Sequence, residues 1–291
     1  MNAPYIWVDG ELVAHDTVHA SLLAHGLHYG TGVFEGIRCY PTDRGPAIFR
    51  LDAHMARFKA GTEALAMSVN VDDLGRAALE LIKKNDHSSA YIRPISYYES
   101  GGLALDVAPL KQRSVVATMA WRSHLGDAAD HAGVSLRTSP YRRISAKSVP
   151  PLKLCGNYVN SILAKLEATR AGYEEALFID DAGYVCEATG ENVFMVTQGK
   201  VVAVDHADAL PGITRDTVIE LTGAETRPVH IDELRVADEI FLTGTSAEVA
   251  GVSQLDDRSF DHRPATREIS QMYQAVVHGR VPRYLDWLST P

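Results

Sequence analysis

The spacing of apolar residues in this chain changes repeatedly between a helical and a strand period. This alternation restricts the fold to mixed α and β structure. Helical spacing is clearest at residues 72–82, where Asp72 is placed to cap a helix. The same spacing predicts helices at 51–68, 157–171, 213–222 and about 269–277. In the helix at 157–171, one apolar stripe contains Val159, Ile162, Leu163 and Leu166.

Strand-like segments fall between these helices. Asp9-Gly10 separates residues 5–8 from 11–13, and this dipeptide favours a tight hairpin turn. Apolar, β-rich segments at 90–98 and 114–121 are typical of neighbouring strands. Further strand pairs are expected around 181–183 and 198–199, with another strand at 239–242.

A polar stretch after Trp121 interrupts both periodicities. The chain has 291 residues, of which 46% are hydrophobic, and this is enough for one large domain or for two medium-sized domains that share a core. We therefore predict a small N-terminal α/β domain over 1–121, an interdomain loop at 122–132 and a large C-terminal α/β domain over 133–291.

Composition and charge argue against several classes of protein. The net charge is −9 and no basic run is present, which argues against a nucleic-acid partner. The three cysteines (Cys39, Cys155 and Cys186) form neither a zinc pattern nor a disulfide framework, so we expect no metal and a reducing compartment. No apolar run approaches the roughly 20 residues that span a bilayer, and no signal peptide is evident. The expected protein is cytoplasmic and has no membrane partner.

Lys153 lies among apolar neighbours directly before a predicted helix. Burial of an ammonium group is costly, and desolvation lowers the pKa of a lysine, which makes its amine a better nucleophile for Schiff-base chemistry. The alternative is a lysine whose stem covers apolar surface while its amine reaches water. The segment alone favours this second interpretation.

Glu187 lies between two apolar, strand-like segments, where a carboxylate needs a cationic or hydrogen-bonding partner. A protonated pyridine nitrogen would be one such partner, because a carboxylate there keeps a PLP (pyridoxal phosphate) ring an effective electron sink. A structural ion pair would satisfy the same carboxylate. Both interpretations stay open at this point.

Two segments suit an anion. Residues 210–216 place a Pro-Gly turn at the start of a helix, where backbone N–H groups and the helix dipole attract phosphate. Residues 243–248 follow a strand and supply hydroxyls and amides. Arg57 could add a bidentate phosphate contact, although the segment alone favours a solvated helix arginine. Capped helix starts of this composition are common.

Together these segments resemble the branched-chain amino acid aminotransferases, which are fold-type IV, D-amino acid aminotransferase-like PLP enzymes. The resemblance runs from about Tyr5 to Val249. The motifs that carry it are Tyr29-Gly30, Val33-Phe34-Glu35-Gly36-Ile37-Arg38, the Arg57 helix, Tyr91-Ile92-Arg93-Pro94, Lys153-x-x-Gly156-Asn157-Tyr158, Glu187-x-x-Gly190-Glu191-Asn192, Leu210-Pro211-Gly212-Ile213-Thr214-Arg215 and Gly244-Thr245.

The resemblance implies a two-domain mixed α/β fold and ping-pong transamination between an L-amino acid, in this family leucine, isoleucine or valine, and 2-oxoglutarate or another 2-oxo acid. Lys153 is then the catalytic residue, holding PLP as a Schiff base. Glu187 would pair with the ring nitrogen, Tyr158 would bind the ring oxygen and Leu210 would pack on the ring face. The implied cofactor-binding residues are Arg57, Lys153, Tyr158, Glu187, Gly190, Asn192, Leu210, Gly212, Ile213, Thr214, Gly244 and Thr245.

The resemblance also implies an apolar substrate site with a few polar anchors. Arg93 would accept the distal carboxylate of glutamate, and the turn at 245–247 would bind the α-carboxylate through backbone amides. Seen alone, Phe34 and Trp121 would more often be core residues. The implied substrate-binding residues are Tyr29, Phe34, Gly36, Tyr91, Arg93, Trp121, Thr245, Ser246 and Ala247.

One segment departs from the family pattern. Residues 97–107 replace the family's Gly-Met-Gly-Val-like loop, which in relatives reaches the neighbouring subunit, and the change leaves the preferred amino donor open. The family implies a homodimer or a larger homo-oligomer. The alternatives are a D-amino acid or atypical amine aminotransferase, an aminodeoxychorismate lyase, and a non-catalytic protein that binds a phosphate ligand.

Overall fold

The computed structural model describes residues 3–121 and 133–291, which divide into two compact units. The first comprises Met1–Arg122, Leu152–Asn157 and Val276–Pro291, and the second comprises Ser123–Pro151 and Tyr158–Ala275. The predicted interdomain loop at 122–132 lies outside the described residues. Residues 152–157, which contain Lys153, group with the N-terminal segment although they belong to the stretch predicted as the C-terminal domain.

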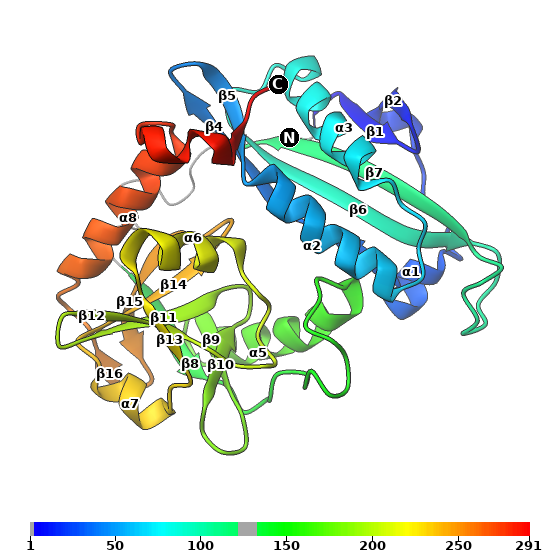
Figure 1. Cartoon of the computed structure of the whole chain (residues 1–291). Coiled ribbons are helices and arrows are strands. Elements are labelled where there is room, and N and C mark those ends of the chain that lie inside the picture. Colours follow the sequence, from blue (N-terminus) through cyan, green and yellow to red (C-terminus); the bar gives the residue numbers. More distant parts are fainter. Residues whose placement is uncertain (1–2, 122–132) are drawn as a thin grey trace. The chain divides into compact units, whose positions relative to one another are not determined.

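The first unit is built on an eight-stranded antiparallel sheet (Figure 1). The strand order is β17-β5-β4-β6-β7-β1-β2, and β3 pairs with β6 off this path. The strands are β1 (Tyr5–Val8), β2 (Glu11–Ala14), β3 (Gly32–Phe34), β4 (Ile37–Thr42), β5 (Gly45–Phe49), β6 (Ala90–Ser100), β7 (Lys111–Ala120) and β17 (Leu288–Ser289).

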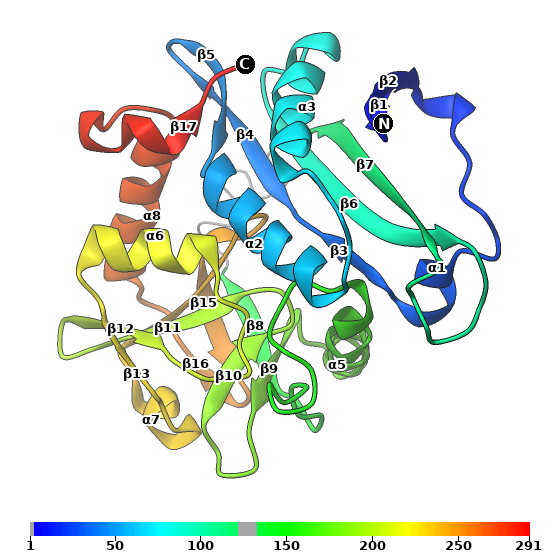
Figure 2. The ribbon, with the colours of Figure 1, turned by 45° about the vertical axis from the view of Figure 1, so that its right-hand side comes forward.

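The hairpin predicted at Asp9-Gly10 is confirmed, with Val8 paired to Glu11 and both turn residues at positive φ. Helices α2 (Leu51–Ala64) and α3 (Val71–Lys84) cover one face of the sheet (Figures 1 and 2). The predicted cap of α3 is wrong: the side chain of Asn70, not Asp72, accepts the Asp72 N–H. Short helices η1 (His15–Thr17), α1 (His25–Tyr29), η2 (Cys155–Asn157) and η3 (Pro282–Trp287) complete the unit.

The second unit contains a nine-stranded mixed sheet in the order β10-β9-β8-β15-β14-β11-β12-β13, with β16 on β15. Both strand pairs expected around 181–183 and 198–199 are present. The strands are β8 (Val134–Thr138), β9 (Glu175–Ile179), β10 (Val185–Ala188), β11 (Asn192–Thr197), β12 (Lys200–Val204), β13 (Glu225–Arg227), β14 (Glu239–Gly244), β15 (Glu248–Leu255) and β16 (Arg258–Ser259). The helices are α5 (Tyr158–Arg170), α6 (Ile213–Thr222), α7 (Ile231–Val236) and α8 (Pro264–Val277), and the last two residues of α8 group with the first unit.

Helix α5 packs with a different face from the one its apolar stripe suggests. Val159, at 60% exposure, and the three other residues of that stripe lie at the surface. The buried face consists of Ser161, Ala164 and Ala168, and these small residues allow the helix to approach β9 closely. Among the described residues, no helix is long and apolar enough to cross a membrane.

Candidate functional site

The segment that carries Lys153 is fixed by main-chain contacts to β3 and to the residue that follows α1. The Phe34 N–H donates to the Lys153 carbonyl at 3.2 Å, and the Gly156 N–H donates to the Gly30 carbonyl at 3.1 Å. Gly30 has φ +67°, and a Cβ there would lie 2.7 Å from the Gly156 Cα, so this close approach requires glycine. The backbone of Lys153 is therefore held opposite Phe34.

The amine of Lys153 lies beside an aromatic ring and close to several charged groups. Its Nζ is 5.1 Å from the centre of the Phe34 ring. Burial lowers the pKa of Lys153, the Glu35 carboxylate opposes this shift, and the Arg57 guanidinium adds to it. The amine is therefore neutral over a wider pH range than that of an exposed lysine, as nucleophilic attack requires.

Glu35 forms a buried ion-pair cluster that was not among the predicted site residues. Arg57 donates from Nε to Oε1 at 2.6 Å and from Nη2 to Oε2 at 2.9 Å, while His54 Nδ1 is 2.8 Å from Oε2. Burial alone would raise the pKa of Glu35, but Arg57 and His54 overcome it and hold this pKa well below its usual range. A glutamate between Phe34 and Gly36 in an apolar, strand-like motif was the available sequence signal.

Five of the predicted substrate-binding residues come together in the first unit. Arg93 donates to the Tyr91 hydroxyl at 2.7 Å and lies over the Phe34 ring at 4.8 Å. Tyr91 stacks on Trp121 with ring centres 5.4 Å apart. A Cβ at Gly36 would clash with the Tyr91 hydroxyl oxygen, so Gly36 makes room for this tyrosine.

Tyr29, the sixth predicted substrate residue of this unit, contacts the divergent loop. Its hydroxyl donates to the Leu103 carbonyl at 3.0 Å, and its side chain is about half exposed. Buried His25 in the same helix lies 3.0 Å from the Ala104 carbonyl oxygen through Nε2. The 97–107 loop is thus tied to α1 by its main chain, and its side chains are not used in these contacts.

Glu187 in β10 is buried, and it forms an ion pair. Arg143 Nε donates to Oε1 at 2.6 Å, and the Leu210 N–H donates to Oε2 at 2.9 Å. Arg143 also donates to Asn160 Oδ1 at 3.1 Å, which fixes the guanidinium. Arg143 was absent from the predicted site.

The two anion-binding segments predicted from the sequence lie next to each other within the second unit. Helix α6 begins after Gly212, whose N-cap position has no side-chain cap bond, and Ile213 and Thr214 are buried. Asn192 Nδ2 donates to the Leu210 carbonyl at 2.9 Å, and a Cβ at Gly212 would clash with Asn192 Oδ1. Asn192 is also paired with Thr243 of β14. Asn192 therefore connects the start of α6 to the strand that leads into the 244–247 turn.

Thr243, in β14, carries a buried hydroxyl group. Its Oγ1 is buried and has no hydrogen-bond partner among the described residues. Gly244 ends β14, and Thr245, Ser246 and Ala247 form the turn between β14 and β15. Ser246 is exposed, and the other three residues are partly buried. The second unit thus contains a helix start without a side-chain cap and a buried hydroxyl without a partner among the described residues. Both can donate hydrogen bonds to the phosphate of a cofactor such as PLP.

The remaining predicted cofactor residues in this unit lie on the same elements. Tyr158 is the first residue of α5 and is partly buried. Gly190 lies between β10 and β11, and its carbonyl oxygen would lie 3.3 Å from a Cβ at Gly244. Gly190 thus borders the strand end that carries the turn.

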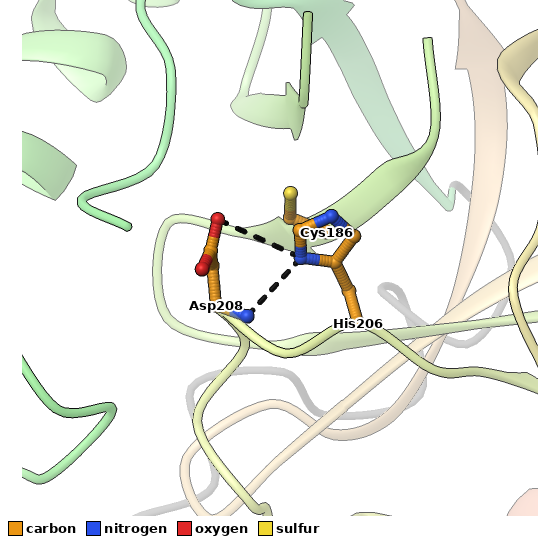
Figure 3. Close-up of side chains that lie close together, drawn as sticks. All are labelled: Cys186, His206 and Asp208. Carbon is orange, nitrogen blue, oxygen red and sulfur yellow. Dashed lines mark hydrogen bonds and ion pairs between the residues drawn. The ribbon is translucent and has the colours of Figure 1, made fainter. Parts of the chain in front are cut away.

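A separate group of potential metal ligands consists of Cys186, His206 and Asp208 (Figure 3). His206 Nδ1 accepts the Asp208 N–H at 3.1 Å, and His206 Nε2 is 3.4 Å from Asp180 Oδ2. Cys186 packs in an apolar cluster with Phe178, and burial raises the pKa of its thiol far above the usual value. Protein atoms engage both imidazole nitrogens, so we assign this group to packing and not to a metal site.

Comparisons with known proteins agree on one family. Residues 32–255 match the family described as amino-transferase class IV. A branched-chain-amino-acid aminotransferase of Pseudomonas aeruginosa is 36% identical, over 97% of this chain and 95% of that protein. The crystal structure of the T.th. branched-chain amino acid aminotransferase with pyridoxamine 5'-phosphate superposes with a TM-score of 0.96 at 40% identity, over 99% of this chain and 98% of that one. The Escherichia coli branched-chain enzyme gives a TM-score of 0.94 at 34% identity, over 99% of both chains.

Proposed function

The chain belongs to the class IV aminotransferases, among the branched-chain-amino-acid aminotransferases, and we propose that it transfers amino groups between L-leucine, L-isoleucine or L-valine and 2-oxoglutarate. The mixed α/β, fold-type IV architecture expected from the sequence is confirmed. The enzyme is PLP-dependent, like its family. When bound, PLP serves as an electron sink for the carbanion at the substrate Cα.

One observation carries the proposal: the Lys153 amine lies beside the Phe34 ring, where burial lowers its pKa. A neutral amine can attack the cofactor aldehyde, and once released it can accept the proton from the substrate Cα and return it. An exposed lysine would be protonated at neutral pH and would do neither step efficiently.

Several residues proposed to hold the cofactor surround the start of α6 in the second unit. The first turn of this helix would donate its main-chain N–H groups to the phosphate, together with the hydroxyl of Thr214 and the turn at Gly244-Thr245. Glu187 would hold the proton of the ring nitrogen, and its ion pair with Arg143 fixes the carboxylate. The full proposed set is Arg57, Lys153, Tyr158, Glu187, Gly190, Asn192, Leu210, Gly212, Ile213, Thr214, Gly244 and Thr245.

The proposed substrate residues provide both apolar surface and charge. Arg93 Nε is buried without a hydrogen-bond partner among the described residues, which supports a role in binding the distal carboxylate of 2-oxoglutarate. The aromatic rings nearby would contact the aliphatic side chains of the donors. The proposed substrate-binding residues are Tyr29, Phe34, Gly36, Tyr91, Arg93, Trp121, Thr245, Ser246 and Ala247.

We further propose that the enzyme is a cytoplasmic homodimer or a larger homo-oligomer. The exposed apolar side chains of Leu22, Leu27 and Leu105 support an interface in the first unit, because large apolar patches on a surface usually mark contacts. Free Cys39, Cys155 and Cys186 are consistent with a reducing compartment. Light scattering coupled to size exclusion measures the oligomeric state, and a strictly monomeric protein would refute this part.

The reaction is tested by a panel of amino donors in single half-reactions, followed through the visible band of the bound cofactor. L-leucine, L-isoleucine and L-valine should each shift the band, and 2-oxoglutarate should restore it. Lys153→Ala should lose nearly all turnover, whereas Lys59→Ala, a change at an exposed lysine of α2, should retain it. Activity confined to D-alanine or to aminodeoxychorismate would refute the substrate assignment, and full activity of Lys153→Ala would refute the mechanism.

A further inference from the structure

Glu35 is fully buried, yet it carries a charge at the centre of four contacts in the first unit. Its oxygens accept two N–H groups of Arg57 and lie within reach of His54 Nδ1, and the Gly36 N–H donates to Oε2 at 3.3 Å. Isolated ionised carboxylates are costly to bury, so this cluster persists because each oxygen is satisfied.

The main chain fixes Glu35 independently of its side-chain partners. Its N–H donates to the Pro94 carbonyl at 3.0 Å, at the end of the β3–β6 pairing. The preceding residue, Phe34, binds the Lys153 carbonyl. Glu35 therefore connects the lysine segment to the strand that carries Arg93.

The side chain of Glu35 in turn fixes α2. His54 and Arg57 are three residues apart and thus lie on the same face of the helix, and one carboxylate binds both. Arg57 uses the edge of its guanidinium formed by Nε and Nη2. The two N–H groups on this edge bind the carboxylate together, so Glu35 fixes the plane of the Arg57 guanidinium.

We propose that Glu35, held by His54, is a positioning residue that orients the Arg57 guanidinium for the cofactor phosphate and supplies negative charge beside the Lys153 amine. This inference rests on the proposed roles of Arg57 and Lys153 in binding PLP. Glu35 itself touches neither substrate nor cofactor in this account. It acts through the arginine and through its charge.

The charges around Lys153 indicate the sign of the second effect. Burial lowers the pKa of the amine, Glu35 and Tyr91 raise it, and Arg57 and Arg93 lower it. Burial also lowers the pKa of His54, and the Glu35 carboxylate opposes this shift. Without the Glu35 carboxylate, the positive charges of Arg57 and Arg93 would lower the pKa of the Lys153 amine further.

The test compares Glu35→Gln with Glu63→Gln, a change at an exposed glutamate of α2. Two quantities are measured: the dissociation constant for PLP, and the pH midpoint of the visible band, which reports protonation of the nitrogen that Lys153 contributes. Glu35→Gln should weaken PLP binding by about tenfold or more, as expected for loss of a charged hydrogen bond. Its midpoint should fall by about one pH unit. Glu63→Gln should leave both unchanged.

A double-mutant cycle separates positioning from a general structural role. In an Arg57→Ala background, Glu35→Gln should not weaken PLP binding further, because the residue through which it acts is gone. A second loss of about tenfold there would contradict the proposal. If Glu35→Gln does not fold, Glu35→Asp serves instead: it retains the charge, so its midpoint should stay at the wild-type value while PLP binds several-fold more weakly.

The results distinguish a failure of the role proposed for Glu35 from a failure of the proposed aminotransferase function. A folded Glu35→Gln protein with wild-type PLP affinity and an unchanged midpoint overturns the role of Glu35 and leaves the aminotransferase proposal intact. A shifted midpoint in Glu35→Asp overturns the role of its charge. A wild-type protein that binds no PLP and shows no visible band overturns the proposed function itself.

Discussion

Glu35 in the first unit and Glu187 in the second are both buried carboxylates that an arginine Nε binds at 2.6 Å. The partners beside the arginines differ in kind. His54 Nδ1 lies 2.8 Å from Glu35 Oε2, whereas the main-chain N–H of Leu210, just before α6, donates to Glu187 Oε2 at 2.9 Å. A buried glutamate–arginine pair is therefore not evidence of a cofactor contact by itself. The roles proposed for the two residues make different predictions.

The largest expected difference is in turnover. Glu187→Gln should reduce kcat for L-leucine and 2-oxoglutarate by at least about 100-fold, because a neutral amide does not hold a proton on the ring nitrogen. Glu35→Gln should lower kcat by about tenfold at saturating PLP, because it acts only through the residues around Lys153. Steady-state kinetics measures both, with exposed Glu220→Gln of α6 as the control. Equal losses of kcat in Glu187→Gln and Glu35→Gln would contradict different roles for the two carboxylates.

The second difference is in stability. Arg143→Met should lower the free energy of unfolding by roughly 3–5 kcal/mol, because it leaves the buried Glu187 carboxylate without its cation. The double variant Arg143→Met with Glu187→Gln should recover part of this loss. Denaturant titration provides the values. A loss below about 1 kcal/mol for Arg143→Met would show that the pair is solvated.

Acid should affect the Glu35 cluster in a defined pH window. The folded-state pKa of Glu35 lies below its unfolded value of about 4.3, so its contribution to stability is complete above that pH and is lost as the pH falls further. The free energy of unfolding of the wild type should therefore decrease more steeply below about pH 4 than that of Glu35→Gln. Parallel pH profiles for the two proteins would contradict an ionised Glu35.

The smallest effect concerns Glu191, whose carboxylate interacts with the charges of Glu175 and Glu187. Burial and the Glu175 charge raise the pKa of Glu191 to about 7. A raised folded pKa means that stability is lost as the pH rises from the unfolded value of about 4.3 to about 7, so Glu191→Gln should raise Tm at about pH 8.5 by about 2 °C and change it little at about pH 4. Differential scanning calorimetry at both values checks this. A lower Tm of the variant at the higher pH would show that the charge is favourably paired.

Periodicity in the sequence predicted the positions of the elements well, but it did not predict which faces are buried. Helices α3 and α5 show similar apolar spacing. Leu74 and Leu81 of α3 are fully buried, whereas Ile162 of α5 is 56% exposed. Apolar spacing identifies the face of a helix that is removed from water, and that face can pack in the core or in an interface with another protein chain. Single-sequence patterns do not separate the two.

Lys153 and Glu187 could be proposed from the sequence because each is a charged residue within an apolar stretch. Their partners were harder to predict. Arg143 lies 44 residues before Glu187, and Glu35 lies 22 residues before Arg57, so each pair forms only when the chain folds. Arg57 was predicted as a phosphate ligand, but its contact with Glu35 follows from the packing of α2 on β3.

The covalent attachment of the cofactor tests the central claim most directly. Borohydride reduction of the PLP-loaded enzyme, followed by proteolysis and mass spectrometry, identifies the modified lysine. The account predicts the pyridoxyl mass on the peptide that contains Lys153 and on no other lysine. Labelling of a different residue such as Lys165, or a wild-type enzyme that catalyses transamination without any label, would contradict it.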